Sequence, residues 1–165
     1  MTTLTRGLLP CTLALGLLLA GCGGGSDSPE PTPIAATLTV SAATSPGFNG
    51  VYTTGAVSLA EVIKVNPIGG EPEVCSFRFS GLANAAGANL NGDIRYLPGT
   101  NALHVVFVAI NGFEFSSRDT TNASVDRPNN EIDFAGKVLA ASTGVASTIT
   151  VSGSIPMRSG RPEGC

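Results

Sequence analysis

The chain has one histidine, His104, so any catalysis that depends on an imidazole must use this residue. The hairpin register predicted below places Asp119 opposite His104, and such an aspartate can orient the ring to act as a base toward a serine. Downstream of residue 22 the sequence contains no G-x-S-x-G, S-x-x-K, H-E-x-x-H, P-loop or G-x-G-x-x-G motif. We therefore interpret His104 and Asp119 as a polar cross-strand pair and expect no catalytic residues.

Oxygen-bearing side chains gather between residues 126 and 133, and calcium prefers such ligands. They are Asp126, Asn129, Asn130, Glu131 and Asp133. Their spacing matches neither an EF-hand nor a nonapeptide repeat, and alternation places Glu131 and Asp133 on the strand face that carries Lys137. A solvated strand face explains them, so we expect no metal and no cofactor. A glycosidase carboxylate pair is a poor alternative, because the chain has no Trp and two Tyr to stack sugars.

The N-terminal segment ends in Leu19-Ala20-Gly21-Cys22, after one basic residue, Arg6, and an apolar run from Leu13 to Ala20. The run is too short to span a bilayer but has the length of a secretory hydrophobic region. The segment resembles a bacterial lipoprotein signal peptide. In that family a diacylglycerol is attached to the cysteine thiol, a peptidase cuts before the cysteine, and its amino group is often acylated, commonly with palmitate. The resemblance implies cleavage after residue 21 and an acylated Cys22.

The resemblance also implies a location in the cell envelope. Two or three acyl chains anchor a protein stably, so we expect the membrane as a partner without a transmembrane helix. Gly23 rather than Asp follows Cys22, which implies the outer membrane. Residues 22–33 are mostly Gly, Ser, Pro and acidic residues, which predicts a flexible tether. Residues 34–165 then form a single domain.

Two cysteines remain for a disulfide, because the resemblance implies that Cys11 lies in the cleaved segment and that Cys22 carries lipid. The envelope outside the inner membrane is oxidising, so we predict a bond between Cys75 and Cys165. It would close a loop of about 90 residues, which the chain-entropy model values at roughly 4–5 kcal/mol as an upper figure. Two free thiols are the alternative. A zinc site is disfavoured, because no Cys-x-x-Cys spacing occurs.

Composition indicates a β-rich domain that does not bind nucleic acid. Removal of residues 1–21 removes Arg6 alone among the charged residues, so the formal net charge goes from −3 to −4. Period-two alternation predicts strands over 37–41, 76–80, 131–134 and 148–152. Turn signals such as Pro46-Gly47 and Asn91-Gly92 separate the strands. We expect an all-β antiparallel meander of about seven to nine strands, barrel-like or a sandwich, with a strand over 57–64 and a surface loop over 82–91.

The clearest local signal is Asn111-Gly112 between two apolar runs, which predicts a two-residue type I′ turn. That turn pairs Ile110 with Phe113 and Val108 with Phe115 on the core face. The opposite face then carries an apolar stripe of Leu103, Val105 and Phe107 beside a polar strand. Something must cover this stripe: a neighbouring strand or the 82–91 loop, unless the stripe is a docking surface for a partner.

These features predict a lipid-anchored envelope protein, with a non-catalytic binding or structural module facing the periplasm or the cell surface. A protein, a peptide, a glycan or an apolar ligand could bind it. The organisation is similar to that of the disulfide-closed eight-stranded barrels found among lipid-anchored periplasmic proteins, including inhibitors of lysozymes. That similarity concerns architecture alone, since no inhibitory loop motif matches. A periplasmic hydrolase or hydrolase inhibitor is the alternative.

Overall fold

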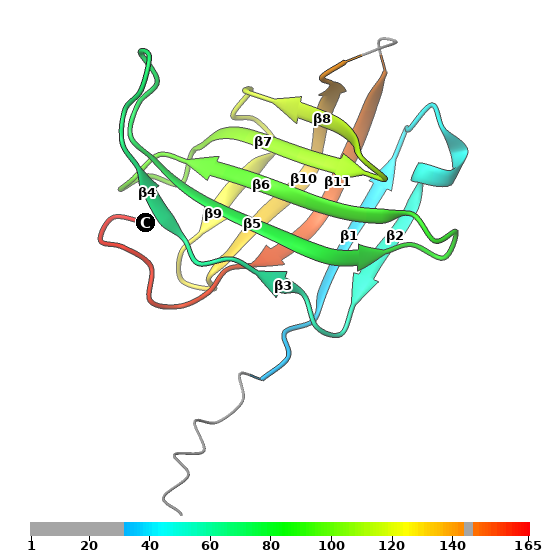
Figure 1. The fold of residues 1–165 in the computed structure, drawn as a ribbon, viewed down its shortest axis with the longest axis horizontal. Helices are drawn as coiled ribbons and strands as arrows, with labels where there is room; N and C mark the ends of the chain where they lie inside the picture. The colour runs from blue at the N-terminus through cyan, green and yellow to red at the C-terminus, as the bar shows by residue number, and fades with distance from the viewer. Residues whose placement is uncertain (1–31, 144–146) are drawn as a thin grey trace, which may run out of the picture. The chain divides into compact units, whose positions relative to one another are not determined.

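The structure is a computed structural model that describes residues 32–143 and 147–165 (Figure 1). The predicted signal segment, Cys22 and most of the predicted tether lie outside the described residues. Thr32–Cys165 forms one compact unit. No helix in the described part of the chain has the length and apolar character needed to cross a membrane.

The described residues form strands that pair antiparallel throughout, so the predicted all-β antiparallel class is confirmed. The strands are β1 (Ala36–Ser41), β2 (Gly50–Thr54), β3 (Ser58–Leu59), β4 (Ile63–Val65), β5 (Val74–Ala83), β6 (Asn89–Tyr96), β7 (Leu103–Ile110), β8 (Phe113–Ser117), β9 (Ala123–Asp126), β10 (Glu131–Ala141) and β11 (Thr148–Pro156). A 3₁₀ turn, η1 (Pro46–Phe48), lies between β1 and β2.

Eight of the strands close into a barrel. They follow the order β11-β1-β2-β5-β6-β7-β8-β10, and the pairing of β10 with β11 completes the circle. The short strands β3 and β4 pair with β5, and β9 pairs with β10. The fold is therefore a barrel rather than a sandwich, with three short strands in addition.

Alternation along the strands fills the barrel interior with side chains. On β1, for example, Ala36, Leu38 and Val40 are buried while the residues between them are exposed. The largest buried aromatic side chains are Tyr52, Tyr96, Phe77 and Phe79, and they belong to one cluster with most of the other buried apolar residues. An eight-stranded barrel has an interior just wide enough for side chains to fill, which agrees with this packing.

The predicted turn at Asn111-Gly112 is confirmed. Both residues have positive φ, 49° and 84°, as a type I′ turn requires. Ile110 pairs with Phe113 and Val108 pairs with Phe115, which is the predicted register.

The predicted surface loop over 82–91 is wrong. Leu82, Ala88 and Leu90 are buried in the core, and the connection between β5 and β6 is limited to residues 84–88. The expected turn at Asn91-Gly92 lies inside β6 instead. A Cβ on Gly92 would lie 2.4 Å from the Phe79 ring, so the glycine makes room for that ring rather than a turn. The predicted strand over 57–64 is divided into β3 and the start of β4.

The two ends of the barrel are covered differently. At the C-terminal end, defined by Tyr96, Arg127 and Cys165, residues 157–165 run from β11 back toward the start of β5. At the opposite end, named the Phe48 end, the β1–β2 connection with η1 packs near the β7–β8 turn. Figure 1 shows the two coverings on opposite sides of the barrel.

Candidate functional site

Charged side chains gather on the outer face of β5 to β8. Arg78 and Asp93 lie opposite each other on β5 and β6, and Arg95 follows on β6. The Oδ2 atom of Asp93 lies 3.3 Å from Arg78 Nε and 3.3 Å from Arg95 Nη2. Ser76 donates a hydrogen bond to Oδ1 of the same aspartate at 3.2 Å. We name this region the charged face, and its ionic side chains pair with one another.

The predicted stripe of Leu103, Val105 and Phe107 does not form one surface. The pairing of β6 with β7 shifts between Arg95 and Tyr96, so β7 contains a bulge. Leu103 consequently faces the core opposite Tyr96 and is 1% exposed. Val105 is also buried, and Phe107 is half-buried with the Arg95 guanidinium 5.3 Å from its ring centroid. These three residues are therefore not a shared docking surface, and the 82–91 loop does not cover them.

The segment between β4 and β5, residues 66–73, reaches this part of the barrel and is named the β4–β5 arm. Its Glu71 places Oε2 2.6 Å from His104 Nε2 on β7. Arg118, just after β8, places Nη1 3.0 Å from Oε1 and 3.1 Å from Oε2 of Glu71. Hydrogen bonds from Arg118 and then from His104 lower the pKa of the Glu71 carboxyl. The three side chains tie the arm to the barrel wall.

The predicted pairing of His104 with Asp119 is wrong. The bulge in β7 falls at residue 104, and β8 ends at Ser117, so the hairpin ladder does not extend to this pair. Asp119 instead accepts hydrogen bonds from the Thr121 hydroxyl at 2.6 Å and from the Thr121 amide at 2.8 Å, and these bonds lower the pKa of Asp119. Glu71 was missed because it is distant in sequence and lies in a connection rather than in a strand.

A carboxylate bound to an imidazole can orient a catalytic base, but the base also needs a nucleophile within reach. In the described part of the chain, His104 Nε2 donates to the Glu71 carboxylate and lies 3.5 Å from Arg118 Nη1, and it forms no hydrogen bond with a serine or threonine hydroxyl. A depression of about 350 Å³ lies near the charged face, between Ser58, Arg78 and Asn91. Arg78 is the one charged residue that lines it, so it holds no acid–base pair.

Three of the five oxygen-bearing residues considered as calcium ligands come together. Carboxylate oxygens of Asp126, Glu131 and Asp133 lie within 4.8 Å of one another, since β9 and β10 pair Asp126 with Glu131. Asn129 instead donates to both carboxylate oxygens of Asp126, at 3.0 and 2.9 Å. Burial and then the charges of Glu131 and Asp126 raise the pKa of Asp133. The cluster is a set of repelling carboxylates, and among the described residues its members join no ion pair.

Lys137 does not lie on that face, contrary to the sequence prediction. The β10–β11 register shifts between Ala135 and Lys137 around Gly136, which has φ 81°. The bulge turns Lys137 inward, where it is 1% exposed and its amine donates to the backbone carbonyls of Asp119 and Thr121. Burial lowers the pKa of this amine. A glycine within an alternating strand is the signal that could have predicted the bulge.

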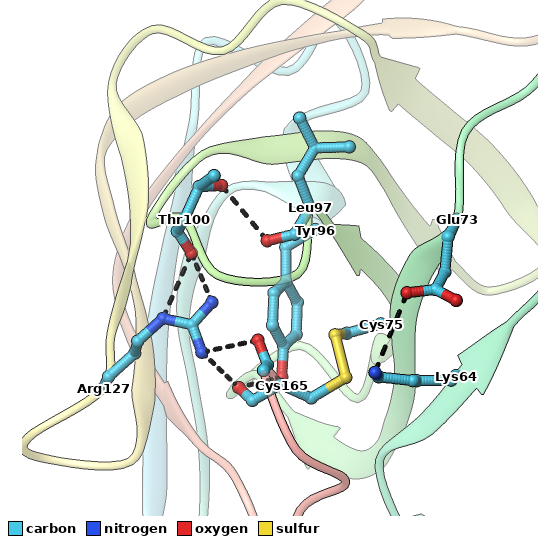
Figure 2. The surroundings of a disulfide bond; sticks show 9 residues. Lys64, Glu73, Cys75, Tyr96, Leu97, Thr100, Arg127 and Cys165 are labelled. Carbon is cyan, nitrogen blue, oxygen red and sulfur yellow. Dashed lines mark hydrogen bonds and ion pairs between the residues drawn. A yellow bond between two sulfur atoms is a disulfide. The ribbon is translucent and has the colours of Figure 1, made fainter.

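The C-terminal end contains the predicted disulfide between Cys75 and Cys165, with a Cα–Cα distance of 5.7 Å (Figure 2). The Tyr96 hydroxyl donates to the main-chain oxygen of Cys165 at 3.0 Å, and Arg127 Nη1 donates to the same oxygen at 2.7 Å. Arg127 Nε also binds the Thr100 carbonyl at 3.1 Å. This arginine joins the β6–β7 connection to the final residues, a role that its sequence context does not predict.

The chain was compared with protein-family models, curated proteins and solved structures, and none of them matches it.

Proposed function

We propose that this chain is a lipid-anchored protein of the bacterial cell envelope, attached to the outer membrane through an acylated Cys22. The observation that carries the proposal is the sequence Leu19-Ala20-Gly21-Cys22 after a short apolar run. The disulfide between Cys75 and Cys165 supports it, because such bonds persist in oxidising compartments outside the cytosol. The Gly- and Ser-containing segment after Cys22 would separate the barrel from the membrane.

The domain acts, in this proposal, as a non-catalytic binding or structural module that uses its outer surface. The barrel interior is packed with side chains, which argues against carriage of a small apolar ligand inside it. His104 donates to Glu71, which Arg118 also binds, and this supports a structural role for His104 and gives no support to the hydrolase alternative. A partner would therefore contact the outside of the barrel.

The anchoring test compares two cysteine variants of the full chain expressed in a bacterial host. Mass spectrometry of the mature N-terminus should find a diacylglycerol thioether at residue 22 in the natural sequence. Cys22→Ser should abolish the modification and release the protein from the membrane or leave it unprocessed. Cys11→Ser is the matched control, because it changes a cysteine of the same segment and should leave acylation intact. Membrane retention of a cleaved Cys22→Ser protein would refute the anchor.

A further inference from the structure

The β4–β5 arm carries the most exposed large apolar side chain of the described residues. Ile68 is 73% exposed, and it stands at the turn of the arm, which projects beyond the barrel wall (Figure 1). Exposure of a branched aliphatic side chain at a projecting tip gives no stability to the domain itself. A single exposed apolar residue is common on a protein surface, so the surroundings of Ile68 carry the argument.

The tip of the arm is conformationally restricted. The Glu71 amide donates to the Ile68 carbonyl at 3.1 Å, and both residues between them, Gly69 and Gly70, have positive φ of 64° and 86°. This is the backbone of a tight hairpin turn. The β4–β5 register pairs Val65 with Val74, and its continuation places Pro67 opposite Pro72. Two prolines, which fix φ and donate no ladder hydrogen bond, explain why strand pairing stops before the turn.

The arm is also fixed to the barrel. Glu71 binds His104 and Arg118 on the barrel wall. Two residues after the end of the arm, Cys75 forms the disulfide with Cys165. Lys64 and Glu73 form an ion pair at 3.8 Å across the base of the arm (Figure 2). A loop that is held in one conformation before binding loses less conformational entropy on association.

The charges around Ile68 indicate the chemistry of what it contacts. The carboxylate of Glu71 is neutralised by Arg118, and that of Glu73 by Lys64. The tip itself consists of uncharged residues, Asn66 to Gly70. A nucleic acid or an anionic surface would find no cationic patch there. An apolar side chain on a rigid, uncharged tip is complementary to an apolar pocket, which is the typical seat of a binding hot spot.

We propose that the β4–β5 arm is a preformed docking element, and that Ile68 is its anchor and fills a concave apolar pocket on a partner protein. This inference rests on the proposed function of the domain as a binding module. It assigns that binding to the arm, with the partner's pocket supplying the apolar surroundings that Ile68 lacks in the free chain.

The test uses the full, membrane-anchored chain in its source cells with the photoreactive residue p-benzoylphenylalanine at position 66. Asn66 is exposed in the arm, so the probe reports contacts of the tip while Ile68 stays free to be varied. We expect one discrete protein adduct. Ile68→Asp should reduce its yield about thirtyfold, which corresponds to about 2 kcal/mol. Val138→Asp is the matched control, because Val138 is 52% exposed on β10 and should leave the yield unchanged.

A second variant tests whether attachment of the arm to the barrel wall contributes to binding. Arg118→Ala removes the guanidinium that binds Glu71, and we expect a two- to fivefold lower adduct yield, about the range of an exposed ion pair. Arg78→Ala, which removes an arginine of the charged face without a contact to Glu71, should have no effect.

Several outcomes would overturn the proposal. They are adducts with lipid alone, an adduct that is insensitive to Ile68→Asp, and the absence of any adduct from position 66. In that case, a discrete protein adduct from the same probe at Val51 or Phe113, two other exposed apolar residues, would show that the domain binds a protein through a surface other than the arm. Acylation of Cys22 is read separately from the intact mass, so a failed anchor and a failed arm give different results.

Discussion

The two ends of the barrel are closed by different kinds of interaction. At the C-terminal end a disulfide, the Tyr96 hydroxyl and the Arg127 guanidinium all hold Cys165. At the Phe48 end the closure is non-covalent: the Phe48 ring lies 5.6 Å from that of Phe113, and Tyr52 donates to the Phe48 carbonyl at 2.9 Å. Each end therefore uses one buried tyrosine, but only the C-terminal end uses a covalent bond.

The difference follows from how each covering segment is attached to the sheet. The β1–β2 connection leaves one paired strand and enters the next, so the barrel restrains it on both sides. Residues 157–165 follow β11 and, among the described residues, contain no strand that would hold them in the sheet. A short segment without ladder hydrogen bonds loses much conformational entropy when it is ordered, and a cross-link to β5 reduces that cost in the unfolded chain. The ends should therefore respond differently to substitution.

The largest effect is expected at the C-terminal end. Replacing both Cys75 and Cys165 with Ala should lower the free energy of unfolding by about 2–5 kcal/mol, because the unfolded chain regains the entropy of a long loop. Urea unfolding of the two proteins measures the difference. Unfolding of the natural sequence under reducing conditions should give the same loss. Equal stability of the oxidised protein and the double variant would show that the disulfide is not what secures this end.

At the Phe48 end the largest effect should come from Asn84. Its side-chain amide donates to the Gly47 carbonyl at 2.9 Å, and its Oδ1 accepts from the amides of Ala86 and Ala88 at 3.0 and 2.9 Å. Asn84→Ala should cost about 1–3 kcal/mol, because buried backbone groups lose their partners. The exposed Asn89→Ala is the control and should stay within about 0.5 kcal/mol. If Asn84→Ala lowers the free energy of unfolding no more than Asn89→Ala does, the Asn84 side chain does not hold this end of the barrel closed.

The two tyrosines give a matched test of the comparison. Tyr52→Phe and Tyr96→Phe each delete one hydroxyl hydrogen bond to a main-chain oxygen, so each should cost about 1 kcal/mol. In the variant without the disulfide, the free-energy cost of Tyr96→Phe should differ from its cost in the natural sequence, because the Tyr96 hydroxyl and the disulfide both hold residue 165. The free-energy cost of Tyr52→Phe should be the same with and without the disulfide, because the two sites are distant from each other. Double-mutant cycles measure the two coupling energies, and equal coupling at the two ends would contradict independent closures.

The smallest effect, and the one of opposite sign, concerns the carboxylates that border the C-terminal end. Burial and the neighbouring acids raise the pKa of Asp133 above its usual 3.8, so folding favours its protonated form. This favourable contribution exists at pH values below the unfolded pKa and is lost as pH rises through the folded pKa. Asp133→Asn should therefore raise the melting temperature slightly at pH 7 and have no effect near pH 3. A lower melting temperature at pH 7 would indicate that the carboxylate has a stabilising partner.

Sequence reasoning was sufficient where periodicity and turn chemistry are local. Asn111-Gly112 determined a turn, and its register followed, since the side-chain period of a strand is two. The disulfide followed from the elimination of other cysteines. The same reasoning failed where a bulge inserts one residue and reverses the alternation. Leu103 and Lys137 both face the core for this reason, although strict alternation places them outside.

Long-range contacts were beyond sequence pattern. The partner of His104 is Glu71, in a connection 33 residues earlier, and the local pattern of charges does not identify it. Buried small residues were also misread: residues 82–91 contain Ala, Asn and Gly, which resemble a loop. Residues 82–83 and 89–91 are strand ends, because the neighbouring strands bury Leu82 and Leu90. Packing against the rest of the barrel decides such segments, and propensity alone does not.

Both ends of the barrel are closed over a core of side chains, so the proposed binding function would use the outer surface. Titration of the native, oxidised protein with the fluorescent fatty acid 11-(dansylamino)undecanoic acid tests this claim most directly. The account predicts no saturable rise in fluorescence. Saturable binding of one probe per chain, abolished by a bulky substitution of an interior residue such as Val108→Trp in a protein that still folds, would contradict it.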